Sequence, residues 1–78
     1  MFDIEFILEQ DGNEVTIAYA LMAQVPAPHD IVMIYGDLKK DTIKPFLVVR
    51  REWQVLNLAD GFRHESREVI VIVQDLGA

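Results

Sequence analysis

The residues best suited to chemistry in this 78-residue chain are Arg50, Arg51 and Trp53, which lie within four consecutive positions. Two guanidinium groups beside an indole could hold a phosphate while a base stacks on the ring. The alternative is structural, with the tryptophan in the core and the arginines extending into water or pairing with acids from the first half of the chain. The cluster is therefore a candidate ligand-binding site for a nucleotide or oligonucleotide.

Two histidine–carboxylate pairs, His29-Asp30 and His64-Glu65, are the next candidates. A histidine beside a carboxylate can act as a general base or a metal ligand. However, both pairs lie in expected loops, where adjacent side chains rarely point the same way, and their spacing matches no metal motif. We therefore expect no metal site and no cofactor.

Groups for nucleophilic catalysis are scarce. The hydroxyl side chains Thr16, Thr42 and Ser66 lie in no nucleophile motif. The absence of cysteine excludes disulfides, thiolate catalysis and cysteine-ligated metal sites. The four glycines are scattered and form no phosphate-binding loop. We expect no catalytic residues and a protein that is not an enzyme.

The net charge of −6 is unevenly distributed. Residues 1–38 contain acids and no Lys or Arg, whereas all seven basic residues lie in 39–67. The halves could pair within one fold, or form a basic patch for an anionic ligand or for an acidic face of a second subunit. Overall acidity weighs against general nucleic-acid binding. No apolar run reaches the length of a membrane span and no signal peptide is evident, so a cytoplasmic location is expected.

The elements that must position these residues are strands. Five segments have strand patterns, with turns or loops between them: 2–9, 14–24, 31–35, 45–58 and 67–75. In the first, Phe2, Ile4, Phe6 and Leu8 alternate with polar residues and are expected to face inward. In the second, the pattern predicts Val15, Ile17, Tyr19 and Leu21 inward and Thr16, Ala18, Ala20 and Met22 outward, with a helix over 17–24 as the weaker alternative.

Turns and loops separate the segments. Asp11-Gly12-Asn13 predicts a hairpin turn, and Asp60-Gly61 another tight turn. The two prolines in 25–28 predict an extended crossing loop rather than an interior strand. No long helix is expected anywhere in the chain.

The stretch 45–58 is the longest apolar one, and it alternates cleanly only if one extra residue is inserted near Arg50-Arg51. Such an insertion is a β-bulge, which reverses side-chain parity and bends a strand. Trp53 then lies on the inward face and is expected to be largely buried. The prediction is one domain over residues 1–78, an all-β, five-stranded, strongly bent antiparallel small barrel of SH3-like or Sm-like type, in which the second or the fourth strand spans both halves.

Segments 31–35 and 69–73 are apolar on both faces, which normally indicates burial on both sides. No helix is available to cover the second face, so a second subunit is the economical cover. The expected partner is a second copy, with a dimer as the first guess, and another protein as the alternative. The residues expected to mediate self-association are Val32, Ile34, Ile70, Val71 and Ile72.

Two patterns resemble known families. Val25-Pro26 with Asp30 and Val32, then Phe46-x-Val48-x-x-Arg51-x-Trp53 and a valine-rich last strand, resembles small uncharacterised bacterial and phage proteins with SH3-like or Sm-like barrels. This chain departs from that pattern at His29, where glycine is usual, and at Arg51, where an apolar residue is usual. A weaker resemblance, at 30–32 and 45–49, is to MazF-like toxin ribonucleases, but the arginine usual before the proline is Lys44 here.

The leading functional hypothesis is therefore a non-enzymatic interaction module that self-associates, an accessory protein of a mobile element. The alternative is a nucleotide or oligonucleotide ligand-binding protein that uses Arg50, Arg51 and Trp53. An RNA-cleaving, toxin-like enzyme is the third hypothesis.

Overall fold

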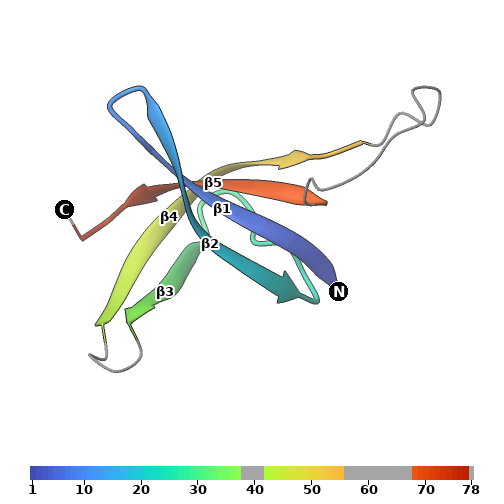
Figure 1. Cartoon of the computed structure of the whole chain (residues 1–78), viewed down its shortest axis with the longest axis horizontal. Coiled ribbons are helices and arrows are strands. Elements are labelled where there is room, and N and C mark those ends of the chain that lie inside the picture. Colours follow the sequence, from blue (N-terminus) through green and yellow to red (C-terminus); the bar gives the residue numbers. More distant parts are fainter. Residues whose placement is uncertain (38–41, 56–67, 78) are drawn as a thin grey trace.

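Five β-strands form one strongly curled sheet in the computed structural model, which describes residues 1–37, 42–55 and 68–77 (Figure 1). The strands are β1 (Phe2–Gln10), β2 (Asn13–Met22), β3 (Ile31–Asp37), β4 (Thr42–Trp53) and β5 (Val69–Asp75). No helix occurs among the described residues. The predicted all-β class and the five strands are confirmed, whereas the predicted Asp60-Gly61 turn lies outside the described residues.

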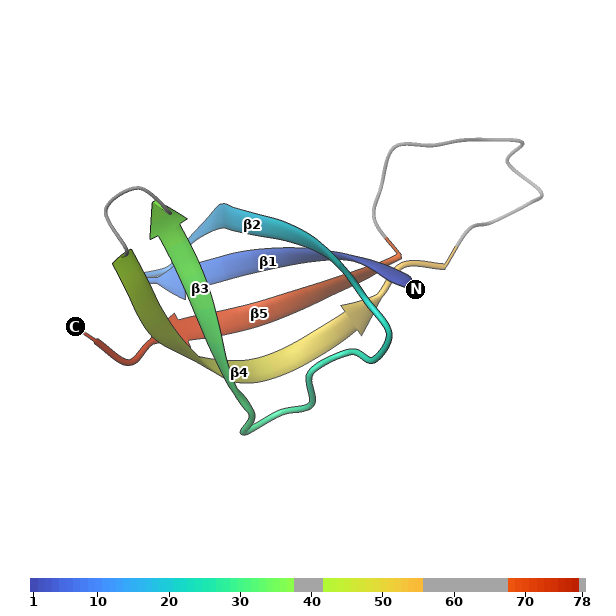
Figure 2. The same cartoon turned by 90° about the horizontal axis from the view of Figure 1, so that it is seen from below.

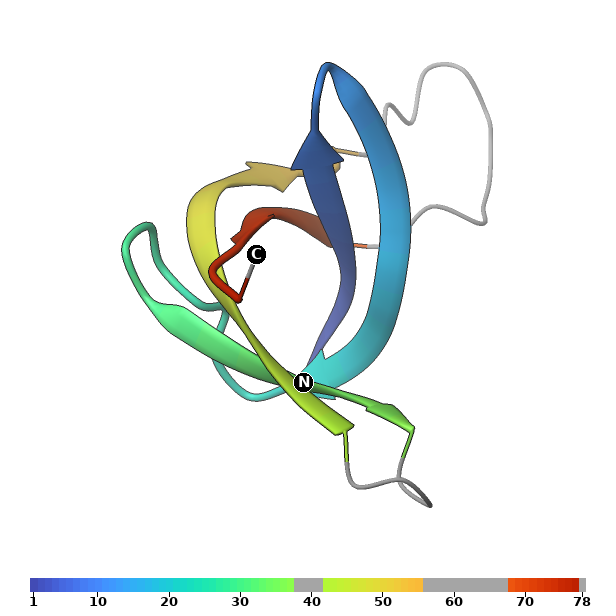
Figure 3. The same ribbon diagram turned by 90° about the vertical axis from the view of Figure 1, so that its left-hand side faces the viewer.

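The sheet order is β2-β1-β5-β4-β3, and β2 and β3 are its two edges. All neighbouring strands are antiparallel except β1 and β5, which are parallel. The sheet is thus mixed, which corrects the expectation of a purely antiparallel one. It curls into a half-barrel around its concave face (Figure 3).

The β1–β2 turn follows the predicted chemistry. Gln10 pairs with Asn13, leaving a two-residue turn in which Asp11 and Gly12 have φ angles of 55° and 80°. Positive φ at both central positions defines the turn whose twist matches that of paired strands.

The long strand β4 connects the two halves of the curl. Its first part pairs with β3 through residues 42–47, and its second part pairs with β5 through residues 46–53. The register with β5 shifts between Val48 and Arg50, so Val49 is the extra residue. The predicted bulge and the strand that spans both halves are therefore confirmed.

The segment between β2 and β3 crosses one end of the sheet and is tied to β4 (Figure 2). Asp30 donates its N–H to the Ala27 carbonyl at 3.0 Å, which closes a turn over Pro28 and His29. Val48 accepts a bond from the His29 N–H (2.9 Å) and donates to the Asp30 carbonyl (2.8 Å). His29 has a φ of 78°. His29 and Asp30 thus lie opposite the single residue Val48, which defines a β-bulge. In this type of bulge the first residue has a positive φ and is usually glycine.

The core fills the concave face. It consists of Ile4 and Phe6 from β1, Phe46 and Val48 from β4, and Val69, Val71 and Val73 from β5. Phe2 and Leu8 pack against this cluster, so the predicted inward face of the first strand is confirmed.

The predicted faces of β2 are wrong for most of its length. Ala18, Ala20 and Met22 pack against the core, and Tyr19 and Leu21 are exposed. The reason is a register shift in the β1–β2 ladder. Phe6 pairs with Ala18 and Ile7 pairs with Thr16, so Ile17 is an extra residue on β2. One extra residue reverses every side chain that follows it.

The positive φ of His29 gives a stability test. Replacing His29 with Gly should raise the free energy of unfolding by about 0.5–1 kcal/mol, because relief of the left-handed strain exceeds the entropy lost on fixing a glycine. Urea unfolding measures the change. His29→Val should be destabilised, and equal stability of the Gly and Val variants would contradict the assigned conformation.

Candidate interaction surface

Arg50 lies on the convex face of the sheet, within a cluster of carboxylates. Its guanidinium is 2.9 Å from Glu52, 3.1 Å from Glu9 and 3.9 Å from Glu14. The hydrogen bonds with Glu9 and then Glu52 are the largest causes that hold the pKa of Arg50 above its ordinary value. Because Glu9 is on β1, the arginine side chain crosses β5 to reach it.

This crossing explains one of the two strands that are apolar on both faces. Arg50 is paired with Ile72, which is buried although it does not belong to the concave core cluster. The methylene stem of an arginine can cover apolar surface while its charged end stays paired. The convex side of β5 at Ile72 is therefore covered from within the same chain.

Arg51 and Trp53 lie on the opposite, concave side, since they pair with the buried residues Val71 and Val69. The guanidinium of Arg51 donates to the Val25 carbonyl at 3.3 Å. Trp53 meets Phe2 edge to face, with ring centroids 5.6 Å apart. Trp53 lies near the end of β4 and is 51% exposed, so the prediction of a largely buried tryptophan is wrong.

The structure does not bring Arg50, Arg51 and Trp53 together as one group. Consecutive residues of a strand point to opposite faces, and here Arg50 is held by acids on one face while Arg51 bonds to a loop on the other. The ion pairs of Arg50 with Glu9 and Glu14 join the basic and acidic halves of the sequence within one fold. This is the intramolecular pairing considered for the uneven charge distribution. Lys44 and Asp75 form a further pair at 3.7 Å.

Of the two histidine pairs, the structure describes only His29-Asp30, and this pair forms no recognised metal site. His29 and Asp30 lie in the bulge described above, where the Asp30 carboxylate accepts the Ala27 N–H at 2.8 Å. His64 and Glu65 lie outside the described residues. Within the described ranges, no three His, Cys, Asp or Glu side chains gather as metal ligands. The same residues contain no helix with the length and hydropathy needed to cross a membrane.

The five residues predicted for self-association differ in what they present to a partner. Val71 and Ile72 are buried. Val32 and Ile34 pack against the core, and Ile70 is half-buried. In the folded chain these side chains form no exposed apolar face, and Val71 and Ile72 have no surface left to contribute.

On β3, the exposed apolar side chains lie on the face opposite Val32 and Ile34. Ile31, Met33 and Tyr35 are 56–59% exposed, and Tyr19 and Leu21 on the other edge strand are equally open. The alternation of the segment 31–35 indicated two apolar faces, but it could not show which of them met the core. The exposed face of β2 could have been found only by locating the bulge at Ile17.

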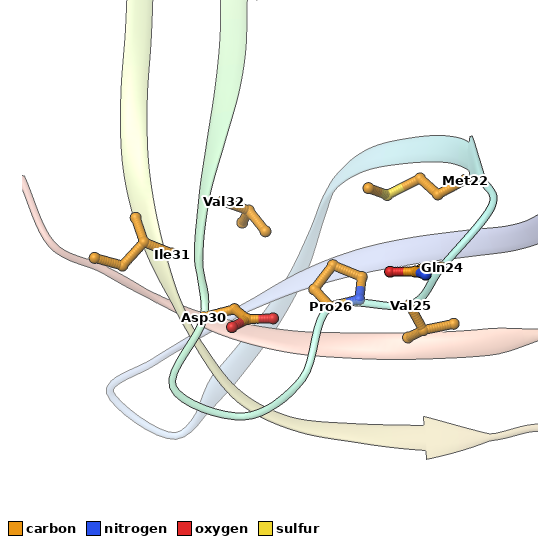
Figure 4. A pocket seen from close by; sticks show the side chains of 7 residues that line it. All are labelled: Met22, Gln24, Val25, Pro26, Asp30, Ile31 and Val32. Carbon is orange, nitrogen blue, oxygen red and sulfur yellow. The ribbon is translucent and has the colours of Figure 1, made fainter.

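A hollow of about 550 Å³ lies between the two edge strands. The residues lining it are Phe6, Ala18, Tyr19, Ala20 and Met22 on one side and Ile31, Val32, Met33, Ile34 and Tyr35 on the other. A second hollow of about 320 Å³ adjoins it at Met22, Ile31 and Val32 and extends under the crossing loop, where Pro26 and Asp30 line it (Figure 4). The larger hollow has no carboxylate, amine or imidazole among its lining side chains.

No family model matches this chain, and no curated protein or solved structure shows significant similarity to it.

The Arg50 cluster predicts a salt-sensitive contribution to stability. Arg50→Gln should lower the melting temperature at low salt, because three carboxylates lose their shared cation and Ile72 loses part of its cover. The difference from the unmodified protein should narrow in about 1 M salt, which screens charges beyond a few ångströms. Lys44→Gln is the control, since its pair with Asp75 is longer, at 3.7 Å, and an exposed lysine in such a pair should contribute little. A difference that does not change with salt would contradict the ion-pair account.

The exposure of Trp53 predicts its fluorescence. Because Trp53 is the only tryptophan, acrylamide should quench the emission of the folded protein readily. Phe2→Ala should increase this quenching by uncovering the indole edge, whereas Phe46→Leu, in the core, should not. Emission that resists acrylamide until the protein unfolds would show that the indole is buried.

Proposed function

We propose that this protein is a non-enzymatic interaction module that self-associates through the open side of its half-barrel. The open side comprises the two edge strands, residues 17–22 of β2 and 31–36 of β3, together with the hollow between them. The observation that carries the proposal is the exposure of large apolar side chains along both of these edge strands.

Edge strands normally carry features that prevent pairing with other chains. Charged side chains, prolines and very short strands are the usual ones. Residues 17–22 and 31–36 contain no Asp, Glu, Lys, Arg or Pro. An edge with these properties favours contact with another polypeptide.

The charge distribution supports a second copy as the partner. A net charge of −6 opposes association of identical chains through most of their surface. The β3 part of the open side avoids this repulsion best, because residues 31–36 contain no acid. On the β2 part, Asp3 and Glu5 of β1 lie beside Leu21 and Tyr19 in the ladder. Burial of apolar surface at about 25 cal/mol per Å² would then drive association.

The chemistry of the hollow supports a binding role rather than catalysis. Its lining side chains are aliphatic, aromatic or thioether groups, and the only polar atoms they carry are the hydroxyls of Tyr19 and Tyr35. General acid–base or nucleophilic catalysis needs a titratable or nucleophilic group held close to a reacting atom. Such a surface is suited to apolar contact.

Light scattering at tens of micromolar tests the proposal. The unmodified protein should have a mass well above the 8.9 kDa of one chain. Met33→Glu should give a folded monomer, because a charge on each copy would enter the contact. Val55→Glu, at a position that is 87% exposed and away from the open side, should associate like the unmodified protein. A monomeric unmodified protein would overturn the proposal.

A further inference from the structure

The backbone groups on the free edge of β3 can be assigned from the hydrogen bonds of β4. The Pro45 carbonyl accepts the N–H of Leu76, just beyond β5, so the backbone polar groups of Pro45 face β5. In an antiparallel ladder, residues whose groups face away from each other form a non-hydrogen-bonded pair. Pro45 is paired with Met33. The N–H and C=O of Met33 therefore point away from β4, toward the open side.

The same parity applies along β3. Ile31 and Tyr35 pair with Leu47 and Ile43, two residues on either side of Pro45, and the β3–β4 register is continuous from Ile31 to Tyr35. The backbone groups of Val48 bond to residues 29 and 30, on the side away from β5. Because Val48 is three residues after Pro45, its groups should face the side opposite to those of Pro45, as they do. Ile31, Met33 and Tyr35 thus present both their backbone groups and their exposed side chains at one edge.

We propose that β3 pairs with β3 of a second copy, antiparallel and about a two-fold axis at Met33, so that two half-barrels share one continuous sheet. This inference rests on the proposed self-association and names its contact. Met33 would face Met33 of the partner subunit as a hydrogen-bonded pair. Ile31 would face Tyr35 of the partner subunit, and Tyr35 would face the partner subunit's Ile31.

The register is self-complementary. A two-fold contact requires that residue i meets j and that j meets i. The stretch Ile31–Tyr35 is regular and centred on Met33, and it meets this requirement. A β-branched side chain opposite an aromatic one is a favourable cross-strand pair. The register of β3 with β4 shifts between Tyr35 and Asp37, so the pairing is assigned to Ile31–Tyr35 alone, a stretch that contains no carboxylate.

The edge of β2 is the less suitable of the two. The extra residue Ile17 interrupts its ladder with β1, and a bulge twists an edge away from flat pairing. Charged residues also precede it at Asp11 and Glu14. The hollow of about 550 Å³ borders both edges, so among the described residues no strand lies between them.

Backbone pairing can be separated from side-chain contact by a proline at Met33. Met33→Pro removes an N–H that points to the open side, so it spares the β3–β4 ladder, and proline is tolerated at such edge positions. We expect a folded protein whose dimerisation is weakened at least ~10-fold, about 1.4 kcal/mol. Met33→Leu, which keeps the N–H and a similar volume, should dimerise like the unmodified protein. Circular dichroism verifies the fold, and sedimentation over a concentration series measures the association.

A second measurement does not depend on how proline affects folding. Because the chain has no cysteine, Met33→Cys introduces a single thiol, and two such thiols would meet at the two-fold axis. With an added oxidant, Met33→Cys should form disulfide-linked dimers much faster than Leu21→Cys, a 65% exposed control on β2.

The outcomes distinguish the inference from the proposal beneath it. Self-association of a folded Met33→Pro at unmodified strength, or cross-linking of Met33→Cys no faster than Leu21→Cys, would overturn β3 pairing and leave the interaction module standing. A monomeric unmodified protein would overturn both, and would leave the edge for a strand of a different protein.

Discussion

The position of Val48 sets the shape of this sheet. Its side chain is in the core, its backbone groups bond to residues 29 and 30, and the ladder with β5 shifts immediately after it. Because Val48 is fixed in these three ways, β4 bends at this residue. Before the bend β4 pairs with β3, and after it β4 pairs with β5 alone. Because β3 follows the first part of β4, this bend also sets the place of β3 relative to β2. The open side is a consequence of the bend.

The same bulge decides what the arginines do. It places Arg50 on the convex face, where acids from β1 and β2 surround it. It places Arg51 on the concave side, where its guanidinium donates a hydrogen bond to a loop carbonyl. A compact cluster in sequence is thereby divided between two faces. Arg50 then gains a structural use, since its stem crosses β5 above Ile72 and its charge balances carboxylates that would otherwise repel one another.

Local patterns predicted the fold well where one signal dominated. The Asp11-Gly12 turn, the alternation of β1 and the parity break near Arg50 each have a single physical interpretation, and all three are confirmed. The faces of β2 were mispredicted because alanines and large residues alternate there, and hydrophobicity alone puts the larger set inside. The curled sheet instead places the small side chains Ala18 and Ala20 inward, where β2 curves over the core.

The candidate site was harder to predict than the fold, since it depends on surroundings that no local pattern contains. Trp53 has the inward register that the bulge implies, yet it lies near the end of β4, where the core no longer covers it. Segment 31–35 was correctly identified as apolar on both faces, but choosing the exposed face requires the pairing with β4. At position 29, where the resembling proteins usually have glycine, the backbone has a positive φ. His29 therefore occupies a conformation that favours glycine.

The two strands that are apolar on both faces have different physical outcomes, and the contrast is informative. In β5 the second face is covered by the Arg50 stem, and the strand lies between β1 and β4. Ile72 is therefore buried within the single chain. In β3 no described side chain plays that part: the strand is at the edge, its convex face is exposed, and half of its backbone groups point to an unfilled hollow. Polar backbone groups and large apolar side chains at one edge are both satisfied by a single kind of partner, another strand. A small ligand could cover the side chains, but only a polypeptide pairs with the backbone as well.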